Sequence, residues 1–155
     1  MNNDVFQGIV DIGVTHAERL QWAMNKLSAM QPFTADKLQH LSAMDMAVLD
    51  QFIVRFSKLQ DVMGAKLLPA VLELTHEEGD LSTFIDKLHR LEKIGAIPSA
   101  DQWLKLREMR NQFAHDYPED PFIQASLLNK SFSMAVELLH ILEVVTTFAR
   151  KYQTN

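Results

Sequence analysis

Apolar residues recur along most of the chain at intervals of three and four positions, the spacing that places them on one face of an α-helix. The first clear stripe follows Thr15 and Glu18, which have the spacing of a capping box, and Pro32 ends it. Its members are Leu20, Ala23, Met24, Leu27 and Met30. The pattern therefore predicts a first helix that opens at Thr15.

A second helical stretch follows Pro32 and keeps its apolar register as far as Gly64. Thr34 can cap this stretch, and Asp45 is a second position at which a helix can begin. The sequence is therefore compatible with either one long helix or two shorter helices in this stretch. Gly64 and Pro69 then interrupt the pattern, and they predict a kink or a restart.

A third helix is predicted after the polar segment THEEGD. Asp80 can cap it, and Gly95 ends it, with Pro98 beyond. Ser99 and Gln102 have the spacing of a capping box and open the next helix. These signals predict two helices joined by a short connection.

The fourth predicted helix ends near Asp116, because Pro118 disfavours helical geometry in the residue before it. Asp120 followed by Pro121 is a typical helix start, and the last helix runs to about Arg150. Short loops between long amphipathic helices favour antiparallel neighbours. We expect an all-α fold: a mostly antiparallel up-and-down bundle of about five helices, forming a single domain over residues 1–155.

Composition narrows the class of protein. The chain has 155 residues, of which 47% are hydrophobic and 23% charged, as in a soluble globular domain with one core. It has no cysteine, which excludes disulfides, thiolate metal sites and cysteine nucleophiles. We see no uninterrupted apolar run near the ~20 residues that span a bilayer, and no signal peptide. We therefore expect a cytoplasmic protein without a membrane partner.

The charge balance is acidic, with a formal net charge of −5 and a pI of about 5.6. Proteins that coat nucleic acid without sequence preference are basic, because phosphate neutralisation supplies most of their affinity. The balance excludes that class, and we expect no DNA partner. A local basic site is still compatible with it, because the field in a cleft depends on neighbouring residues.

Most histidines in the chain have ordinary explanations. Five of the six lie in polar surroundings or at the edge of an apolar face, and we interpret them as structural or solvated. They are His16, His40, His76, His89 and His140. The sequence has neither a zinc-protease histidine pair nor a glycine-rich phosphate loop, so it predicts no metal and no cofactor.

The segment from Leu104 to Pro118 is different, because its helix has two distinct faces. At 100° per residue, Met109 and Phe113 return close to Leu106 and mark the face turned to the bundle.

Asn111 and His115 lie one turn apart on the far side, with Leu104. Arg107 falls between the two faces, and Arg110 flanks the core stripe. Since an apolar residue shares the face that bears Asn111 and His115, we expect a second protein surface or a substrate to cover it.

The string R-N-Q-F-A-H-D-Y, from Arg110 to Tyr117 and followed by Pro118, resembles the signature of the HEPN domain family. It is most similar to the subgroup of toxins that stand beside a minimal nucleotidyltransferase antitoxin. The resemblance is specific over residues 99–120 and architectural elsewhere. It implies a metal-independent endoribonuclease that cleaves RNA as a symmetric homodimer, with both motifs facing one cleft.

Carried over residue by residue, the resemblance makes Arg110 and His115 the catalytic pair. It makes Asn111 the residue that positions them, and we add Arg107 as a supporting residue. Tyr117 matches the tyrosine to which the partner nucleotidyltransferase attaches AMP, which silences the toxin. Because Pro118 follows it, we expect the Tyr117 ring at the mouth of the cleft, although packing on the bundle end is also open.

The residues by themselves also fit other interpretations. Arg110 can pair with Glu108 or Asp116, and His115 can stabilise the helix C-terminus. At the level of function, the alternatives are a non-catalytic, nucleotide- or substrate-binding partner subunit of a nucleotidyltransferase and a helical dimer used only for interaction.

Overall fold

The computed structural model describes residues 1–115 and 117–153, and it is helical with no strand in those ranges. The long helices are α1 (Asn3–Leu27), α3 (Ala43–Val62), α6 (Ala100–His115) and α7 (Pro121–Arg150). The shorter ones are α2 (Ala35–Gln39), α4 (Leu68–Leu74) and α5 (Phe84–Lys93), with a 3-10 turn η1 (Ser28–Met30) and a π-helical turn η2 (Met63–Leu67). The expected all-α bundle is confirmed.

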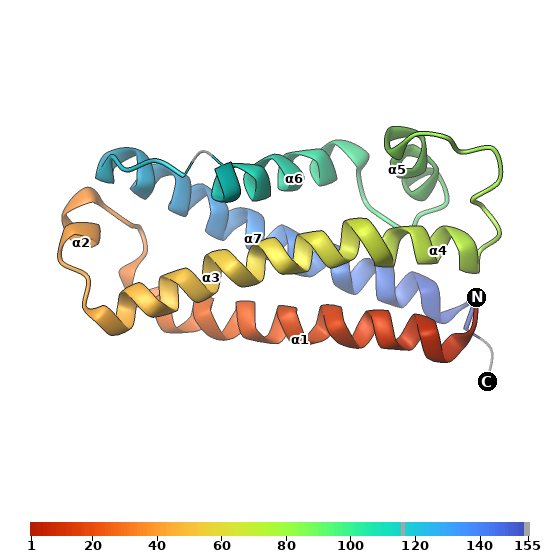
Figure 1. Ribbon diagram of the computed structural model, residues 1–155, viewed down its shortest axis with the longest axis horizontal. Coiled ribbons are helices and arrows are strands. Elements are labelled where there is room, and N and C mark those ends of the chain that lie inside the picture. The colour runs from red at the N-terminus through yellow and green to blue at the C-terminus, as the bar shows by residue number, and fades with distance from the viewer. Residues whose placement is uncertain (116, 154–155) are drawn as a thin grey trace.

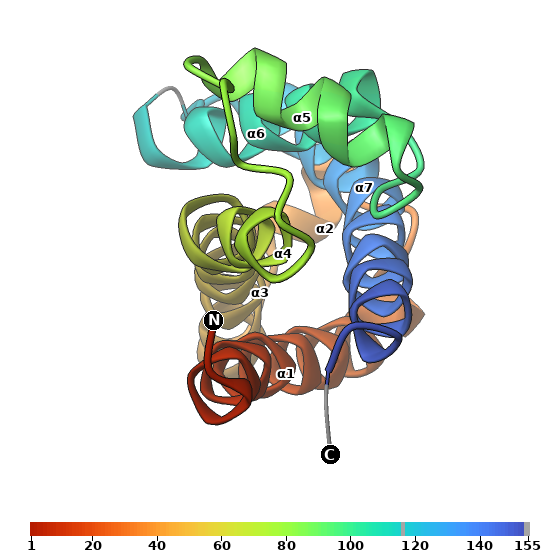
Figure 2. The same ribbon diagram turned by 90° about the vertical axis from the view of Figure 1, so that its right-hand side faces the viewer.

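The four long helices run alternately up and down, as Figure 1 shows. Viewed from the end, α1 lies opposite the layer formed by α5 and α6 (Figure 2). The helices α3 and α4 form one side of the bundle, and α7 forms the other. The chain passes through α3, η2 and α4 without a break, so the described residues form six continuous helical segments. The last turn of α6 and the first turn of α7 lie at the same end of the bundle (Figure 1).

The start of α1 differs from the sequence prediction. The first helix begins at Asn3, where the Asn2 side chain accepts a hydrogen bond from the amide of Asp4. Thr15 is an interior residue, and its hydroxyl donates to the carbonyl of Asp11. The earlier start is stabilised because Phe6 and Val10 are buried. The prediction of a start at Thr15 was therefore wrong.

The helix α5 starts later than predicted. Its cap is Thr83 rather than Asp80, and the Thr83 hydroxyl accepts a hydrogen bond from the amide of Asp86. The predicted end is confirmed, since Gly95 follows the helix with φ at +86°, a conformation that favours glycine.

Other caps follow the sequence. Thr34 caps α2, and Asp120 accepts amide hydrogen bonds from the first residues of α7. Between the two alternatives left open, a separate α3 is the correct one, but its cap is Ser42, which accepts from the amide of Asp45. Ser99 accepts from the amide of Gln102 at 3.2 Å, whereas the Gln102 side-chain oxygen is buried and has no hydrogen-bond partner among the described residues.

The interruption at Gly64 and Pro69 is a π-helical turn. Pro69 lacks the N–H that an α-helix would pair with the carbonyl of residue 65. The wider turn over Met63–Leu67 lies directly before it and carries the chain from α3 into α4.

An aromatic cluster holds α6 against α3 and α7. Phe52 stacks on Phe132 with ring centroids 4.3 Å apart, and Phe56 meets Phe113 edge to face at 5.5 Å. These four side chains are buried in the main core. Burial of this size dominates the energetics of a small domain, so the face of α6 that bears Phe113 is fixed.

Among the described residues, α7 is the one helix long and apolar enough to cross a membrane by length and composition alone. Its most apolar window has a mean hydropathy of 1.5. Half of that window is buried in the bundle, where α7 packs against α1, α2, α4 and α6. A central core helix has the same profile.

Candidate functional site

The helix α6 carries the site, and its core face is the one that the sequence predicts. Trp103, Leu106, Met109 and Phe113 are buried, while Arg107, Asn111 and His115 are exposed. His115 is the last residue of the helix, and Asp116 lies outside the described residues. The core face and the polar side of the motif are thus fixed by one set of buried contacts.

Arg110 is held by a carboxylate from another helix. Its Nε donates to Asp61 Oδ1 at 2.7 Å, and its Nη2 donates to Oδ2 at 2.9 Å. The hydrogen bond to Asp61 raises the pKa of the guanidinium, which stays charged. In the described part of the chain this pairing comes from Asp61, 49 positions earlier, and not from Glu108. The alternative partner Asp116 lies outside the described residues. The pair uses two of the five arginine N–H donors.

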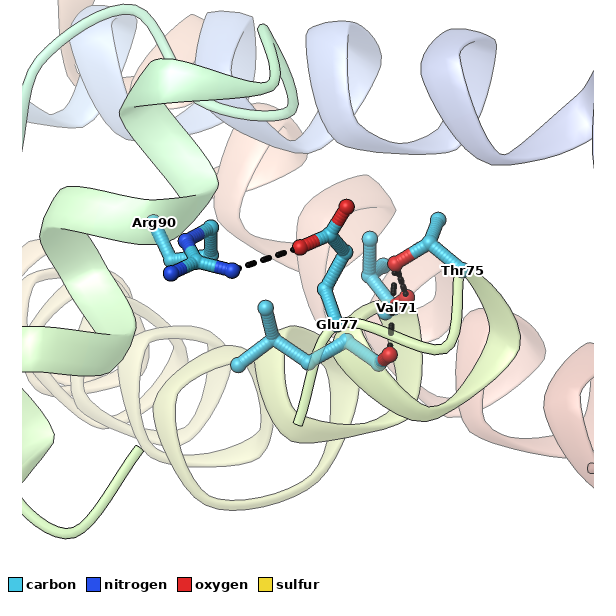
Figure 3. A network of polar contacts seen from close by, with 5 residues as sticks. Val71, Thr75, Glu77 and Arg90 are labelled. Atoms are coloured by element: carbon cyan, nitrogen blue, oxygen red, sulfur yellow. Dashed lines mark hydrogen bonds and ion pairs between the residues drawn. The ribbon is translucent and has the colours of Figure 1, made fainter. Parts of the chain in front are cut away.

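Arg107 lies on an aromatic ring of α5. Its guanidinium carbon is 5.0 Å from the centroid of Phe84. α5 is in turn tied to the loop after α4, because Arg90 Nη1 donates to Glu77 Oε2 at 2.7 Å (Figure 3). In the same network the hydroxyl of Thr75 donates to the carbonyl of Val71. The Arg90–Glu77 pair therefore ties down the helix that carries Phe84.

The motif residues do not all meet within one chain. His115 follows Arg110 by five residues, which places it about 140° further around the helix. Asn111 is one turn from His115, and both are exposed. Leu104, expected to lie open on this face, is half-buried and packs against the core. In the first turn of α7, which lies at this end of the bundle, Phe122 and Ile123 are exposed apolar side chains, at 76% and 57% exposure.

Tyr117 packs on the bundle rather than lying free. Its ring centroid is 6.1 Å from that of Phe113, and the side chain is half-buried against the core. Burial raises the pKa of the phenol, and the nearby charge of Asp50 raises it further. Of the two alternatives for this residue, packing on the bundle end is the correct one, because the Phe113 ring offers it apolar surface.

A pocket of about 520 Å³ lies beside Arg110, between the α3–η2 segment and α6, with α5 at its edge. Its principal lining residues are Asp61, Gly64, Phe84, Trp103, Arg107 and Arg110. Sequence reasoning assigned Gly64 only to a helix interruption and did not place Asp61, Phe84 or Trp103 near the site. No local signal identifies them, because tertiary packing brings them together.

The other histidines lie elsewhere. His16 lies inside α1, and its Nδ1 accepts a hydrogen bond from Arg55 Nη1 at 2.8 Å. Burial lowers the pKa of His16, as do the charges of Arg55, Lys58 and Arg19. In the described ranges, no three His, Asp or Glu side chains are grouped so that they could hold a metal ion.

No protein-family model, curated protein or solved structure matches this chain. The site offers a charged, oriented arginine, an exposed histidine and amide at a helix end, and a pocket with two guanidinium groups.

Proposed function

We propose that this protein is a metal-independent endoribonuclease, the toxin of a toxin–antitoxin module, acting in the cytoplasm as a homodimer. The observation that carries the proposal is the arrangement of Arg110, Asn111 and His115 on α6. Arg110 is pre-oriented by Asp61 at 2.7 and 2.9 Å, while Asn111 and His115 are exposed at the helix end.

The reaction that suits these groups is attack by the RNA 2′-hydroxyl on the adjacent phosphorus. The 2′-oxygen forms a bond to phosphorus as the bond from phosphorus to the 5′-oxygen breaks. A neutral imidazole accepts the proton of the 2′-hydroxyl, and an imidazolium donates a proton to the leaving 5′-oxygen. The products are a 2′,3′-cyclic phosphate and a 5′-hydroxyl.

Each residue has a role in that step. Histidine titrates near neutrality and can serve as either acid or base. The motif has one histidine per chain, so a symmetric dimer supplies the second. Arg110 would bind the phosphorane oxygens through its remaining N–H donors, with Arg107 and Asn111 as supporting and positioning residues. Positive charge held in place before the reaction lowers the barrier without reorganisation.

The test is incubation of the purified protein with a varied RNA pool in excess EDTA, with the His115→Ala protein as control. We expect cleavage by the natural protein alone, and products that carry 5′-hydroxyl and 2′,3′-cyclic phosphate ends. Intact RNA in the presence of a folded dimer would contradict the proposal for the isolated chain.

One observation favours a second candidate function. Within one chain Arg110 is engaged by Asp61, and His115 projects from a different side of α6. Such a chain suits a non-catalytic subunit that docks a minimal nucleotidyltransferase and presents its substrate. Co-purification of a nucleotidyltransferase, with nucleotide affinity and no loss of RNA, would favour this alternative. A small nucleotidyltransferase gene next to this one fits either function.

A further inference from the structure

The pocket beside Arg110 has a net positive charge in an acidic protein. Its ionisable lining groups are Arg107, Arg110 and Asp61, two cations against one anion. Arg110 is fixed by Asp61, and Arg107 rests on the Phe84 ring, so both guanidinium groups are held in place. A site of this charge favours a ligand with a single phosphodiester.

Apart from these charged groups and Gln60, the pocket is lined by apolar side chains and a glycine, which suit a flat group. Its floor includes Trp103, which is fully buried, and one wall is Phe84. Gly64 keeps the space above the indole open, because a Cβ there would approach Trp103 Cζ2 to 3.2 Å. A volume of about 520 Å³ is in the range of small-molecule sites.

The floor also contains an unpaired donor. Trp103 Nε1 is buried and has no hydrogen-bond partner among the described residues. Nε1 is bonded to Cε2, and the Cε2–Cζ2 edge is the part of the ring nearest Gly64. A buried donor without a partner costs free energy. The Gly64 side of the pocket lies in the π-helical turn η2, and such turns are frequent at functional sites.

We infer that this pocket is the subsite for one unpaired nucleotide of single-stranded RNA, next to the phosphate that is cleaved. The base of this nucleotide lies above Gly64, against Phe84 and the Arg107 guanidinium. The phosphate of the nucleotide binds Arg107 and Arg110. Bases of single-stranded RNA stack on aromatic rings and on arginine planes in this way. The inference rests on the proposed function, but it is measured by binding rather than by cleavage.

Trp103 provides the measurement. The chain has two tryptophans, and Trp22 is half exposed on α1, so Trp22→Phe leaves Trp103 as the single reporter. The probe is a 2′-O-methyl adenosine dinucleotide, which cannot undergo 2′-hydroxyl attack. We expect a saturable change in tryptophan emission as the dinucleotide is added. The affinity should fall as the salt concentration increases.

Ala65 offers a blocking variant with a matched control. Ala65 lines the pocket and is exposed, whereas Ala47 is an exposed alanine of α3 outside it. In the Trp22→Phe background, Ala65→Leu should weaken dinucleotide binding at least tenfold, and Ala47→Leu should leave it unchanged. Arg107→Gln removes one of the two cations without filling the space, and it should also weaken dinucleotide binding. This variant keeps the test available if Ala65→Leu does not fold.

The outcomes separate the two proposals. Saturable binding that Ala65→Leu and Arg107→Gln reduce supports the subsite, even when RNA is not cleaved and the proposed function fails. No saturable signal, or equal affinity in both variants and in the Ala47→Leu control, overturns the subsite. RNA cleavage at the natural rate by Ala65→Leu also overturns it, while the proposed ribonuclease stands.

Discussion

Asp61 holds Arg110 through two hydrogen bonds, from Nε at 2.7 Å and from Nη2 at 2.9 Å. The two side chains come from α3 and α6, and they are 48% and 26% exposed. Exposed ion pairs contribute little to the free energy of unfolding, typically about 0–1 kcal/mol. The fork geometry nevertheless fixes the guanidinium plane. We therefore interpret the pair as a device that orients Arg110.

The first prediction separates this orienting role from charge. Asp61→Asn keeps one acceptor oxygen but places an amide N–H₂ toward Nη2, so Arg110 loses its fork. We expect kcat for RNA cleavage to fall roughly tenfold, because small misplacements of a reacting group are costly. KM should not rise, since a negative charge has left the pocket. Asp50→Asn makes the same change on α3 without a bond to Arg110, and an equal loss of kcat there would contradict the prediction.

The second prediction concerns the catalytic pair. Arg110→Ala and His115→Ala should each abolish cleavage and cost no more than about 1 kcal/mol of unfolding free energy, because both side chains lie outside the core. Arg110→Lys should also be poor, since an ammonium has no planar fork. Phe113→Ala is the structural comparison, with an expected loss of about 3–5 kcal/mol. Urea unfolding that gives similar losses for all of them would identify Arg110 and His115 as structural residues.

The third prediction is a homodimer at the end of the bundle that carries His115. Light scattering at micromolar concentration should give twice the chain mass of 17.7 kDa. Phe122 and Ile123 are exposed at that end, so the double variant Phe122→Ser with Ile123→Ser should dissociate the dimer without lowering helicity.

The same dimer also predicts how a mixed dimer should behave in a cleavage assay. A heterodimer of one natural chain and one His115→Ala chain should retain far less than half of the activity, because acid and base come from different chains. Half activity, or a monomeric natural protein, would eliminate the composite site.

The fourth prediction is AMP attachment to Tyr117. The phenol has to leave the Phe113 ring to react, and its pKa is raised by burial, so transfer should depend on a base supplied by the nucleotidyltransferase. Incubation with the neighbouring nucleotidyltransferase and ATP should add AMP units to the intact mass and stop RNA cleavage by charge and bulk. Tyr117→Phe should remain an active nuclease and gain no mass. An adduct that persists in Tyr117→Phe would place the modification elsewhere.

The fifth prediction is a pH dependence of stability through His16. Its pKa in the folded state is lowered from 6.5, chiefly by burial and then by Arg55, Lys58 and Arg19. Above pH 6.5 the imidazole is mostly neutral in both states and contributes no pH dependence. As the pH falls below 6.5, the unfolded chain binds a proton that the folded chain does not, so folding stability declines.

The matched variant for this test is His16→Gln, which keeps an acceptor for Arg55 but does not titrate. Urea midpoints at pH 7.5 and 5.5 should fall more for the natural protein than for the variant. Equal declines in the two proteins would show that His16 contributes nothing to the pH dependence.

Most of the helices could be predicted from local chemistry. Thr34, Asp120 and Gly95 are local signals for two helix starts and one end, and each holds in the structure because a cap needs only neighbouring backbone groups. The start of the first helix was missed because tertiary packing, and not a local cap, decides it. Thr15 has the form of a cap, but burial of Phe6 and Val10 extends the helix to Asn3.

The faces of α6 were also determined by sequence alone. Helical spacing assigned Met109 and Phe113 to the core and Asn111 and His115 to the other side, and all four lie as predicted. Leu104 was assigned to the same side as Asn111, but it is half-buried against the core. Periodicity reports which side of a helix is apolar, since that depends on the sequence of the helix itself.

Only the tertiary structure decided what surrounds the motif. The partner of Arg110 is Asp61 on α3, and the ring beneath Arg107 is Phe84 on α5. The packing of α6 on α3, with the π-helical turn beside it, brings Gly64 next to Trp103. No rule of spacing relates residues so far apart in sequence. The sequence determines the helices and their apolar faces, and the pocket exists because those faces pack in one arrangement that also brings their polar edges together.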